Sequence, residues 1–142
     1  GRRVNDAMAA YVARRTIQHI LAAGRELQKA RVLVLGATFK ENVSDIRNSK
    51  VADVVKTLQS YQLDVDVVDP HAHAEEVQEE YGFTLANGIS GTYDAIVVAV
   101  NHDEYASRDQ AWFQNILNEG GIVVDVKGIY RNQLPDLAYW SL

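Results

Sequence analysis

The chain has 142 residues, 47% of them apolar, and its 14 Lys and Arg against 19 Asp and Glu give a formal net charge of −5. This composition allows a domain with a buried core and argues against disorder, while the absence of any basic run argues against nucleic acid as a partner. With no cysteine, the chain can form neither disulfides nor thiolate metal sites, and it has no cysteine nucleophile of its own.

No apolar run approaches the roughly 20 residues that cross a bilayer, and no signal-peptide pattern is visible, which predicts a cytoplasmic protein without a membrane partner. The chain begins with Gly and continues with polar and basic residues, so we interpret it as a fragment of a longer polypeptide. The first predicted element is a helix over residues 4 to about 27. Its apolar stripe is wider than one core face needs, which favours packing on a further domain or subunit.

Strands and helices are then expected in alternation. Strands are predicted where β-branched and apolar residues follow one another, and helices where apolar residues recur at three- and four-residue spacing. The expected strands cover residues 31–35, 63–68, 93–100 and 122–125, with weaker ones at 83–85 and 137–140, and the expected helices cover 49–61, the segment from Pro70 to about Tyr81, and 110–118. This order predicts a doubly wound α/β domain with a parallel sheet, preceded by one long helix.

The segment 31–50, RVLVLGATFKENVSDIRNSK, is the best candidate for a ligand site. A buried strand ends in Gly36 and a polar loop follows, and in an open parallel sheet such a loop lies at the carboxyl edge, where ligands bind. Lys40 and Arg47 are two cations that favour a polyanion such as a diphosphate. Lys127, in D-V-K-G after a later strand, should reach the same edge.

The same cations have a plainer interpretation. Lys40 and Arg47 could belong to a solvated loop in which Arg47 pairs with Asp45 or Glu41, an arrangement that contributes little energy. The sequence leaves both interpretations open, although the convergence of Lys127 on the same edge favours the ligand site.

Two other kinds of site are disfavoured. A self-contained dinucleotide site would need three glycines where only Gly36 stands, and Asp69 follows it by 33 residues rather than by about 20. His71, His73 and His102 lack a spacing typical of metal ligands, so no metal is expected. His102 is the one histidine that should lie at the edge where ligands bind.

Four motifs carry the most specific information: G-R-R-V-N-D-A-M at the start, G-A-T-F-K-E-N-V-S-D-I-R-N-S after the first strand, V-V-D-P-H at the second strand and V-V-D-V-K-G near the end. Together they resemble the C-terminal part of the UDP-glucose/GDP-mannose dehydrogenase family, over essentially the whole chain. The E-N-x-x-D-x-R-N form is most similar to bacterial enzymes that oxidise UDP-N-acetylhexosamines. The resemblance implies that residues 1–28 end the central dimerisation helix and that residues 29–142 form the Rossmann-like, UDP-sugar-binding domain.

The resemblance also implies roles for individual residues. Lys40 would contact the UDP phosphates, Phe39 would line the nucleotide pocket, and Lys127 would be the basic residue near the substrate. Arg47 would correspond to the arginine that reaches NAD across the domain cleft.

At the start of the chain, Arg2 or Arg3, with Asn5 nearby, falls in the region that supplies an arginine to the sugar site of the partner subunit. Nothing local distinguishes this role from simple tail charges and a helix cap.

The implied parent enzyme oxidises the C6 hydroxyl of a UDP-sugar to a carboxylate with two NAD, through a cysteine-bound thiohemiacetal and thioester, for surface polysaccharide synthesis, and acts as a homodimer. In the family the cysteine and the glycine-rich NAD loop lie upstream, so NAD would be bound mainly by the absent N-terminal domain and this fragment should be inactive alone. The alternative is a stand-alone nucleotide-sugar-binding or regulatory module. A flavodoxin-like receiver would need an acidic pair that the first strand lacks.

Overall fold

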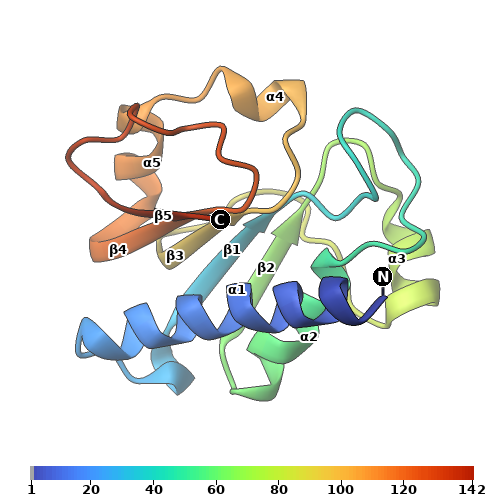
Figure 1. The fold of residues 1–142 in the computed structure, drawn as a ribbon, viewed down its shortest axis with the longest axis horizontal. Coiled ribbons are helices and arrows are strands. Elements are labelled where there is room, and N and C mark those ends of the chain that lie inside the picture. The colour runs from blue at the N-terminus through green and yellow to red at the C-terminus, as the bar shows by residue number, and fades with distance from the viewer. Residues whose placement is uncertain (1) are drawn as a thin grey trace.

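The computed structural model describes residues 2–142, with side chains from residue 7 onward. Within this range five strands form one parallel sheet in the order β2-β1-β3-β4-β5 (Figure 1). The strands are β1 (Arg31–Leu35), β2 (Asp64–Val68), β3 (Tyr93–Val98), β4 (Leu117–Asp125) and β5 (Ala138–Ser141). The chain moves outward from β1 in one direction and then in the other, so the topological switch point lies between β1 and β3.

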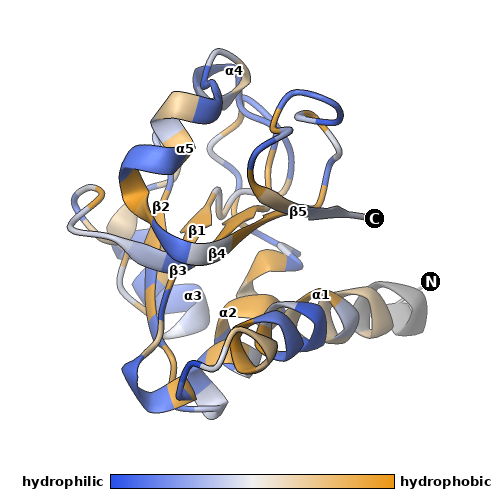
Figure 2. Ribbon diagram, turned by 90° about the vertical axis from the view of Figure 1, so that its left-hand side faces the viewer, coloured by the Kyte–Doolittle hydropathy of each residue, from blue (hydrophilic) through white to orange (hydrophobic). Residues whose placement is uncertain are grey.

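Helices cover both faces of the sheet (Figure 2). The long helix α1 (Arg2–Ala22) packs against α2 (Val51–Ser60) on one face, and α4 (Asp103–Ala106) and α5 (Gln110–Ile116) lie on the other. Helix α3 (Ala74–Tyr81) lies beside the β2 edge, and the short 3-10 helix η1 (Leu27–Lys29) leads into β1. The predicted doubly wound α/β fold with one long preceding helix is therefore confirmed. No helix in the described part of the chain has the length and apolarity required to cross a bilayer.

The two faces are built by alternation along the strands. In β1, Val32 and Val34 join the core beneath α1 and α2, whereas Leu33 and Leu35 join the core beneath α4 and α5. Every residue of the central strand β3 is buried, which explains why its sequence is apolar except for Asp94. The β2 strand is partly exposed, in agreement with the alternation of Asp and Val in its sequence, because it forms one edge of the sheet.

The weak strand predicted at residues 83–85 is wrong. Phe83 and Leu85 are buried in the core beneath α1 and α2, so their apolar character reflects packing by a loop. This segment reaches the sheet through the hydrogen bond from Ala86 N–H to Val67 O (2.8 Å), but it does not extend into a ladder. Burial and strand pairing produce the same local pattern, which is why the sequence alone could not separate them.

Several element boundaries also differ from the prediction. The first helix ends at Ala22, because Gly24 adopts a left-handed conformation (φ +80°) just beyond it. Helix α2 begins at Val51, and Ser49 does not cap it: its hydroxyl is buried without a hydrogen-bond partner, and its N–H donates to the Tyr81 hydroxyl (3.1 Å). Strand β4 begins at Leu117 rather than at residue 122, so it includes Gly120 and Gly121.

Gly36 allows the β1 loop to pass close to the end of β3. Its φ is +100°, and a Cβ at this position would lie 2.6 Å from Cβ of Val100. Both the backbone conformation and the close approach therefore require glycine at the switch point.

We expect Gly36→Ala to lower the free energy of unfolding by about 2 to 4 kcal/mol, because alanine is strained at positive φ and its methyl group would overlap Val100. Urea unfolding followed by circular dichroism measures the change. Gly88→Ala is the matched control, since a Cβ there meets nothing within 4 Å and the backbone needs no positive φ. Equal urea midpoints for Gly36→Ala and the wild type would contradict this account.

Candidate functional site

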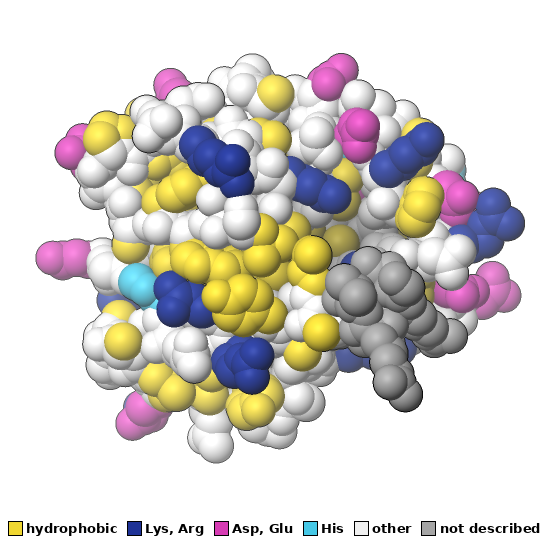
Figure 3. All heavy atoms as spheres, viewed as in Figure 1, with side chains coloured by type: hydrophobic (Ala, Val, Ile, Leu, Met, Phe, Trp, Pro, Cys, Tyr) yellow, Lys and Arg dark blue, Asp and Glu magenta, His cyan; other side chains and the backbone are white. Residues whose placement is uncertain are grey.

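A cavity of about 240 Å³ opens beside the carboxyl ends of β1 and β3, between the sheet and helices α1 and α2. Most of its wall is apolar, and the polar groups come from loops at its rim. The lining residues are Met8, Ala9, Val12, Thr38, Phe39, Asn48, Lys50, Val51, Val54, Val97, Ala99, Val100, Val126 and Lys127. An apolar pocket with a few cationic groups at a topological switch point has the properties of a ligand site. The surrounding surface beside α1 is also apolar and is flanked by Lys and Arg (Figure 3).

Two of the residues predicted from the sequence meet at this cavity. Phe39, in the loop after β1, and Lys127, in the loop after β4, both line it, although 88 positions separate them in the chain. The side chain of Phe39 is a large hydrophobic group left 54% exposed, which a ligand could cover. Asn48 and Lys50 also line the cavity, and sequence reasoning missed them because nothing in their local pattern separates them from other polar loop residues.

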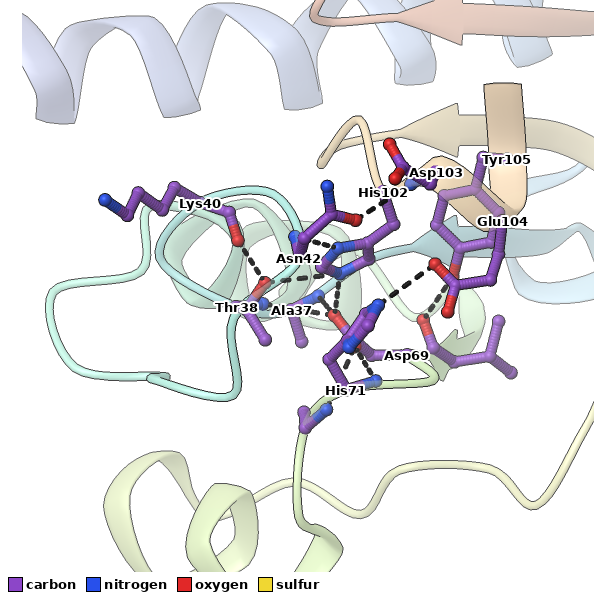
Figure 4. Close-up of polar contacts among 12 residues, drawn as sticks. Ala37, Thr38, Lys40, Asn42, Asp69, His71, His102, Asp103, Glu104 and Tyr105 are labelled. Carbon is purple, nitrogen blue, oxygen red and sulfur yellow. Dashed lines mark hydrogen bonds and ion pairs between the residues drawn. The ribbon is translucent and has the colours of Figure 1, made fainter. Parts of the chain in front are cut away.

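The structure places the other two loop cations elsewhere. Lys40 is exposed and does not line the cavity, and its side chain extends away from the buried cluster behind the loop (Figure 4). Arg47 is exposed and forms two hydrogen bonds to the Asp45 carboxylate, both of 3.1 Å, which lower the pKa of Asp45. The plainer interpretation of Arg47 as a locally paired side chain is therefore confirmed for this structure, and a role towards NAD stays a prediction. The side chains of Arg2, Arg3 and Asn5 lie outside the described residues.

Lys127 is held by a turn built on the buried carboxylate of Asp125. This carboxylate accepts hydrogen bonds from Gly128 N–H (3.0 Å) and Tyr130 N–H (2.8 Å), and Gly128 adopts the positive φ of 70° that the turn requires. The D-V-K-G motif is thus a compact turn at the end of β4 that fixes the backbone of Lys127 beside the cavity.

A second carboxylate, Asp69 at the end of β2, organises the loop that carries Phe39. Its Oδ2 accepts hydrogen bonds from Ala37 N–H (2.6 Å) and Thr38 N–H (3.2 Å), while Oδ1 accepts from His71 N–H (2.7 Å). Burial by itself raises the pKa of Asp69, but the hydrogen bonds from Ala37, His102 and His71 outweigh burial and hold the pKa below its ordinary value. The N–H groups of Ala37 and Thr38 in the β1 loop are therefore both bound to a carboxylate of the protein.

This arrangement bears on the kinds of ligand the site could hold. In a dinucleotide-binding loop, backbone N–H groups after β1 bind the pyrophosphate, but here Asp69 occupies two of them. An anion bound at the cavity would therefore have to be recognised by side chains such as Lys50 and Lys127, which line it. Among the described residues no cluster of three or more histidine and carboxylate side chains could hold a metal ion.

The histidines at this edge take part in protein contacts. His102 is fully buried and hydrogen-bonds the Asp69 carboxylate (2.9 Å), and His71 contacts the Glu104 carboxylate (3.0 Å). The pair of Asp69 and His102 was missed in the sequence because its members are far apart in the chain. The useful signal was that each follows a strand whose carboxyl end lies at the same edge.

A cleft at the switch point of a doubly wound sheet, apolar inside and lined by lysines, is the kind of site in which an α/β domain can hold an anionic ligand with an apolar part. The UDP binding domain of the UDP-glucose/GDP-mannose dehydrogenase family matches residues 33–132. The chain belongs to this family, and the resemblance seen in its motifs is confirmed.

Individual relatives agree with this assignment. The chain is 38% identical over 138 residues to a UDP-N-acetyl-D-glucosamine 6-dehydrogenase of Pseudomonas aeruginosa, covering 96% of this chain and 33% of that protein. It is 40% identical over 133 residues to the protein CapL of Staphylococcus aureus, covering 93% and 31%. The solved native structure of the UDP-N-acetyl-mannosamine dehydrogenase Cap5O from Staphylococcus aureus superposes with a TM-score of 0.78 at 25% identity, covering 99% of this chain and 32% of that one. The chain spans about a third of the length of these relatives.

We expect Asp69→Asn to lower the free energy of unfolding by about 2 to 3 kcal/mol at neutral pH, because an amide NH₂ would face N–H donors that now point at a carboxylate. Because the folded-state pKa lies below the ordinary value of about 3.9, the carboxylate stabilises the fold above that value, and this contribution is lost as the pH falls through the folded-state pKa. The variant should therefore lose less stability than the wild type on acidification.

The measurement is urea unfolding of both proteins between about pH 7 and pH 2.5, a range that brackets the titration of an ordinary carboxylate. Asp103→Asn, at an exposed position, is the control and should follow the wild type throughout. Parallel pH curves for Asp69→Asn and wild type would show that the Asp69 carboxylate does not stabilise this loop.

Proposed function

We propose that this chain is the UDP-binding part of a nucleotide-sugar 6-dehydrogenase, which oxidises the C6 hydroxyl of a UDP-sugar to a carboxylate with two NAD for surface polysaccharide synthesis. The observation that carries the proposal is the cavity at the switch point, with Phe39 and Lys127 on its wall. Two relatives, a UDP-N-acetylglucosamine 6-dehydrogenase and a UDP-N-acetylmannosamine dehydrogenase, favour a UDP-N-acetylhexosamine as the substrate.

The cavity supplies complementary groups for a nucleoside diphosphate. Its apolar wall, formed by residues of α1, α2 and β3, can cover a planar base, and the exposed ring of Phe39 can pack against it. The ammonium groups of Lys50 and Lys127 at the rim can pair with phosphate oxygens, where partial desolvation strengthens the interaction. The expectation from the family that Lys40 contacts the phosphates would require its side chain to turn from its present direction towards the rim.

Residues 1–28 are proposed to be the end of the central helix of the parent enzyme, through which it would form a homodimer, and residues 29–142 its UDP-sugar-binding domain. Helix α1 supports this division, because it buries one stripe on the sheet and α2 while Met8, Tyr11 and Leu21 remain exposed. Exposed large apolar groups on a long helix favour a further protein surface that covers them. The roles of Arg2, Arg3 and Asn5 at the sugar site of the partner subunit belong to this proposal.

NAD accepts the hydrides in the proposed reaction, and in this chain only Arg47 is proposed to contact it. Arg47 would have to exchange its bonds to Asp45 for bonds to NAD, which is feasible because both side chains are at the surface. The rest of the NAD site and the catalytic cysteine are proposed to lie in the part of the parent that this chain does not include. The cytoplasmic location expected from the sequence stays a prediction.

A stand-alone binding or regulatory module is the alternative. The relatives named above include enzymes about three times the length of this chain, and their names support a dehydrogenase parent instead. An upstream G-x-G-x-x-G and a cysteine in the parent gene would decide between the two.

Calorimetric titration with UDP at low salt tests the site. We expect the wild-type chain to bind UDP and Lys127→Ala to bind it about tenfold more weakly, because one charge-assisted contact to phosphate is lost. Lys29→Ala removes another exposed lysine, which pairs with Glu26 and does not line the cavity, and it should leave the affinity unchanged. If Lys127→Ala binds UDP with the affinity of the wild type, Lys127 does not belong to the site. If Lys40→Ala loses as much affinity for UDP as Lys127→Ala, the side chain of Lys40 turns towards the ligand.

The fragment itself should not catalyse the reaction. Mixed with NAD and UDP-N-acetylglucosamine, the purified chain is expected to form no NADH above the rate of a protein-free blank. Most of the NAD site is proposed to lie in the missing part of the parent, which prevents the first hydride transfer, and the chain has no cysteine to carry the thiohemiacetal for the second. The absorbance of NADH gives the rate directly. Sustained NADH formation that copurifies with the chain would refute the assignment of catalysis to the missing part.

A further inference from the structure

The ring of His102 joins three segments of the chain at the carboxyl edge of the sheet (Figure 4). It follows β3, is 0% exposed, and places Nε2 2.9 Å from Oδ2 of Asp69 at the end of β2. The same nitrogen lies 3.2 Å from Oγ1 of Thr38, and Nδ1 accepts a hydrogen bond from Asn42 N–H at 2.9 Å. One buried side chain therefore contacts both ends of residues 38–42.

These contacts fix the tautomer of the ring. A backbone N–H can only donate, so Nδ1 of His102 must carry the lone pair that Asn42 N–H approaches. Nε2 then carries the hydrogen, which it donates towards the Asp69 carboxylate, with Thr38 Oγ1 close by. The Thr38 hydroxyl donates its own hydrogen to the carbonyl of Lys40 (2.8 Å), so its oxygen is free to face Nε2–H.

The segment held in this way carries Phe39, which lines the cavity. Further hydrogen bonds join it to its surroundings: Phe39 N–H donates to Asp45 O (2.7 Å), and Asn42 Oδ1 accepts from Asp103 N–H (3.0 Å). Asn42 has a φ of +60°, a conformation that is uncommon for any residue other than glycine. The contacts of its amide with His102 and of its side chain with Asp103 hold this residue in that conformation.

We propose that His102 is a positioning residue of the ligand site, whose Nδ1 holds the 38–42 segment in the form that keeps Phe39 on the cavity wall. This inference rests on the proposed function, because it concerns the affinity for UDP. A histidine with a purely structural role would affect the stability of the fold without any selective effect on this loop.

Two conservative substitutions separate the two sides of the ring. In His102→Asn the amide oxygen takes the position of Nδ1 and can still accept from Asn42 N–H, whereas the contact with Asp69 is lost. In His102→Gln the amide nitrogen takes the position of Nε2 and can still donate to Asp69, whereas Asn42 N–H loses its acceptor. Both variants should be less stable than the wild type, so stability alone does not distinguish them.

Hydrogen exchange of backbone amides, followed by NMR, measures the order of the loop, and calorimetry with UDP measures its effect on binding. In His102→Gln we expect the Asn42 amide to exchange at least about tenfold faster and the dissociation constant for UDP to rise about fivefold or more. In His102→Asn we expect both quantities to stay within about threefold of the wild type, since the hydrogen bond to Asn42 is kept. His71→Gln is the control: His71 packs on the His102 ring at 4.5 Å but bonds Glu104, so loop exchange and UDP affinity should not change.

Each other outcome decides against a part of the inference. Unchanged exchange at residues 39–42 in His102→Gln would overturn it whether or not UDP binds. If the loop amides exchange faster in His102→Gln but the affinity for UDP is unaltered, His102 has only a structural role. The same conclusion follows if His102→Gln and His102→Asn lose equal affinity for UDP. If the wild-type chain shows ordered loop amides but no UDP binding, the proposed function fails, and with it the claim about affinity, while the exchange data still decide whether Nδ1 orders the loop.

Discussion

Asp69 lies at the end of β2, and its carboxylate is buried. The carboxylate accepts hydrogen bonds from Ala37 and Thr38 in the β1 loop and from His71 and Ala72 in its own loop. It also accepts one from His102, which follows β3. Parallel strands end with backbone N–H groups that need partners once they are removed from water. One carboxylate meets this need for two neighbouring strands and connects them to a third. The shape of the loop that carries Phe39 therefore depends on a contact made behind the cavity and outside it.

A second buried carboxylate accepts backbone hydrogen bonds at the end of β4. There Asp125 accepts from Gly128 and Tyr130 and thereby fixes the turn that carries Lys127. Two buried carboxylates thus organise the two loops that meet at the cavity, although neither carboxylate lines it. Because Asp69 occupies N–H groups of the β1 loop, lysine side chains at the rim are left to recognise an anion. This division distinguishes the domain from a dinucleotide-binding Rossmann domain, in which the loop itself binds the phosphates.

The long helix α1 connects the cavity to the expected context of the domain. Ala9 and Val12 from its buried stripe line the cavity, and Met8 on its more exposed side does so as well. A surface that packs on α1 in a longer protein would therefore lie next to the ligand. This proximity gives a physical route by which a surface packed on α1 could add groups to the proposed site.

Much of the fold could be predicted from the sequence, because strand and helix periodicity are local properties. The mostly apolar sequence of β3 fits its burial, and the polar alternation of β2 fits its position at the edge of the sheet. The failure at residues 83–85 shows the limit, since an apolar loop packed on the core has the pattern of a strand. At the site, Phe39 and Lys127 were found through motifs, and the structure brings both to one cavity.

The sequence by itself determined the fold class, the family and the loops that carry ligand-binding candidates, because each is encoded in patterns of neighbouring residues. Only the tertiary structure decided that Lys50 and Asn48 join the cavity wall, that Lys40 and Arg47 lie off it, and that Asp69 meets His102. Those facts depend on the direction of side chains and on which strand ends become neighbours. The strand order decides which strand ends become neighbours, and competition for hydrogen bonds at the sheet edge decides where the side chains point. Neither can be predicted from a local sequence pattern.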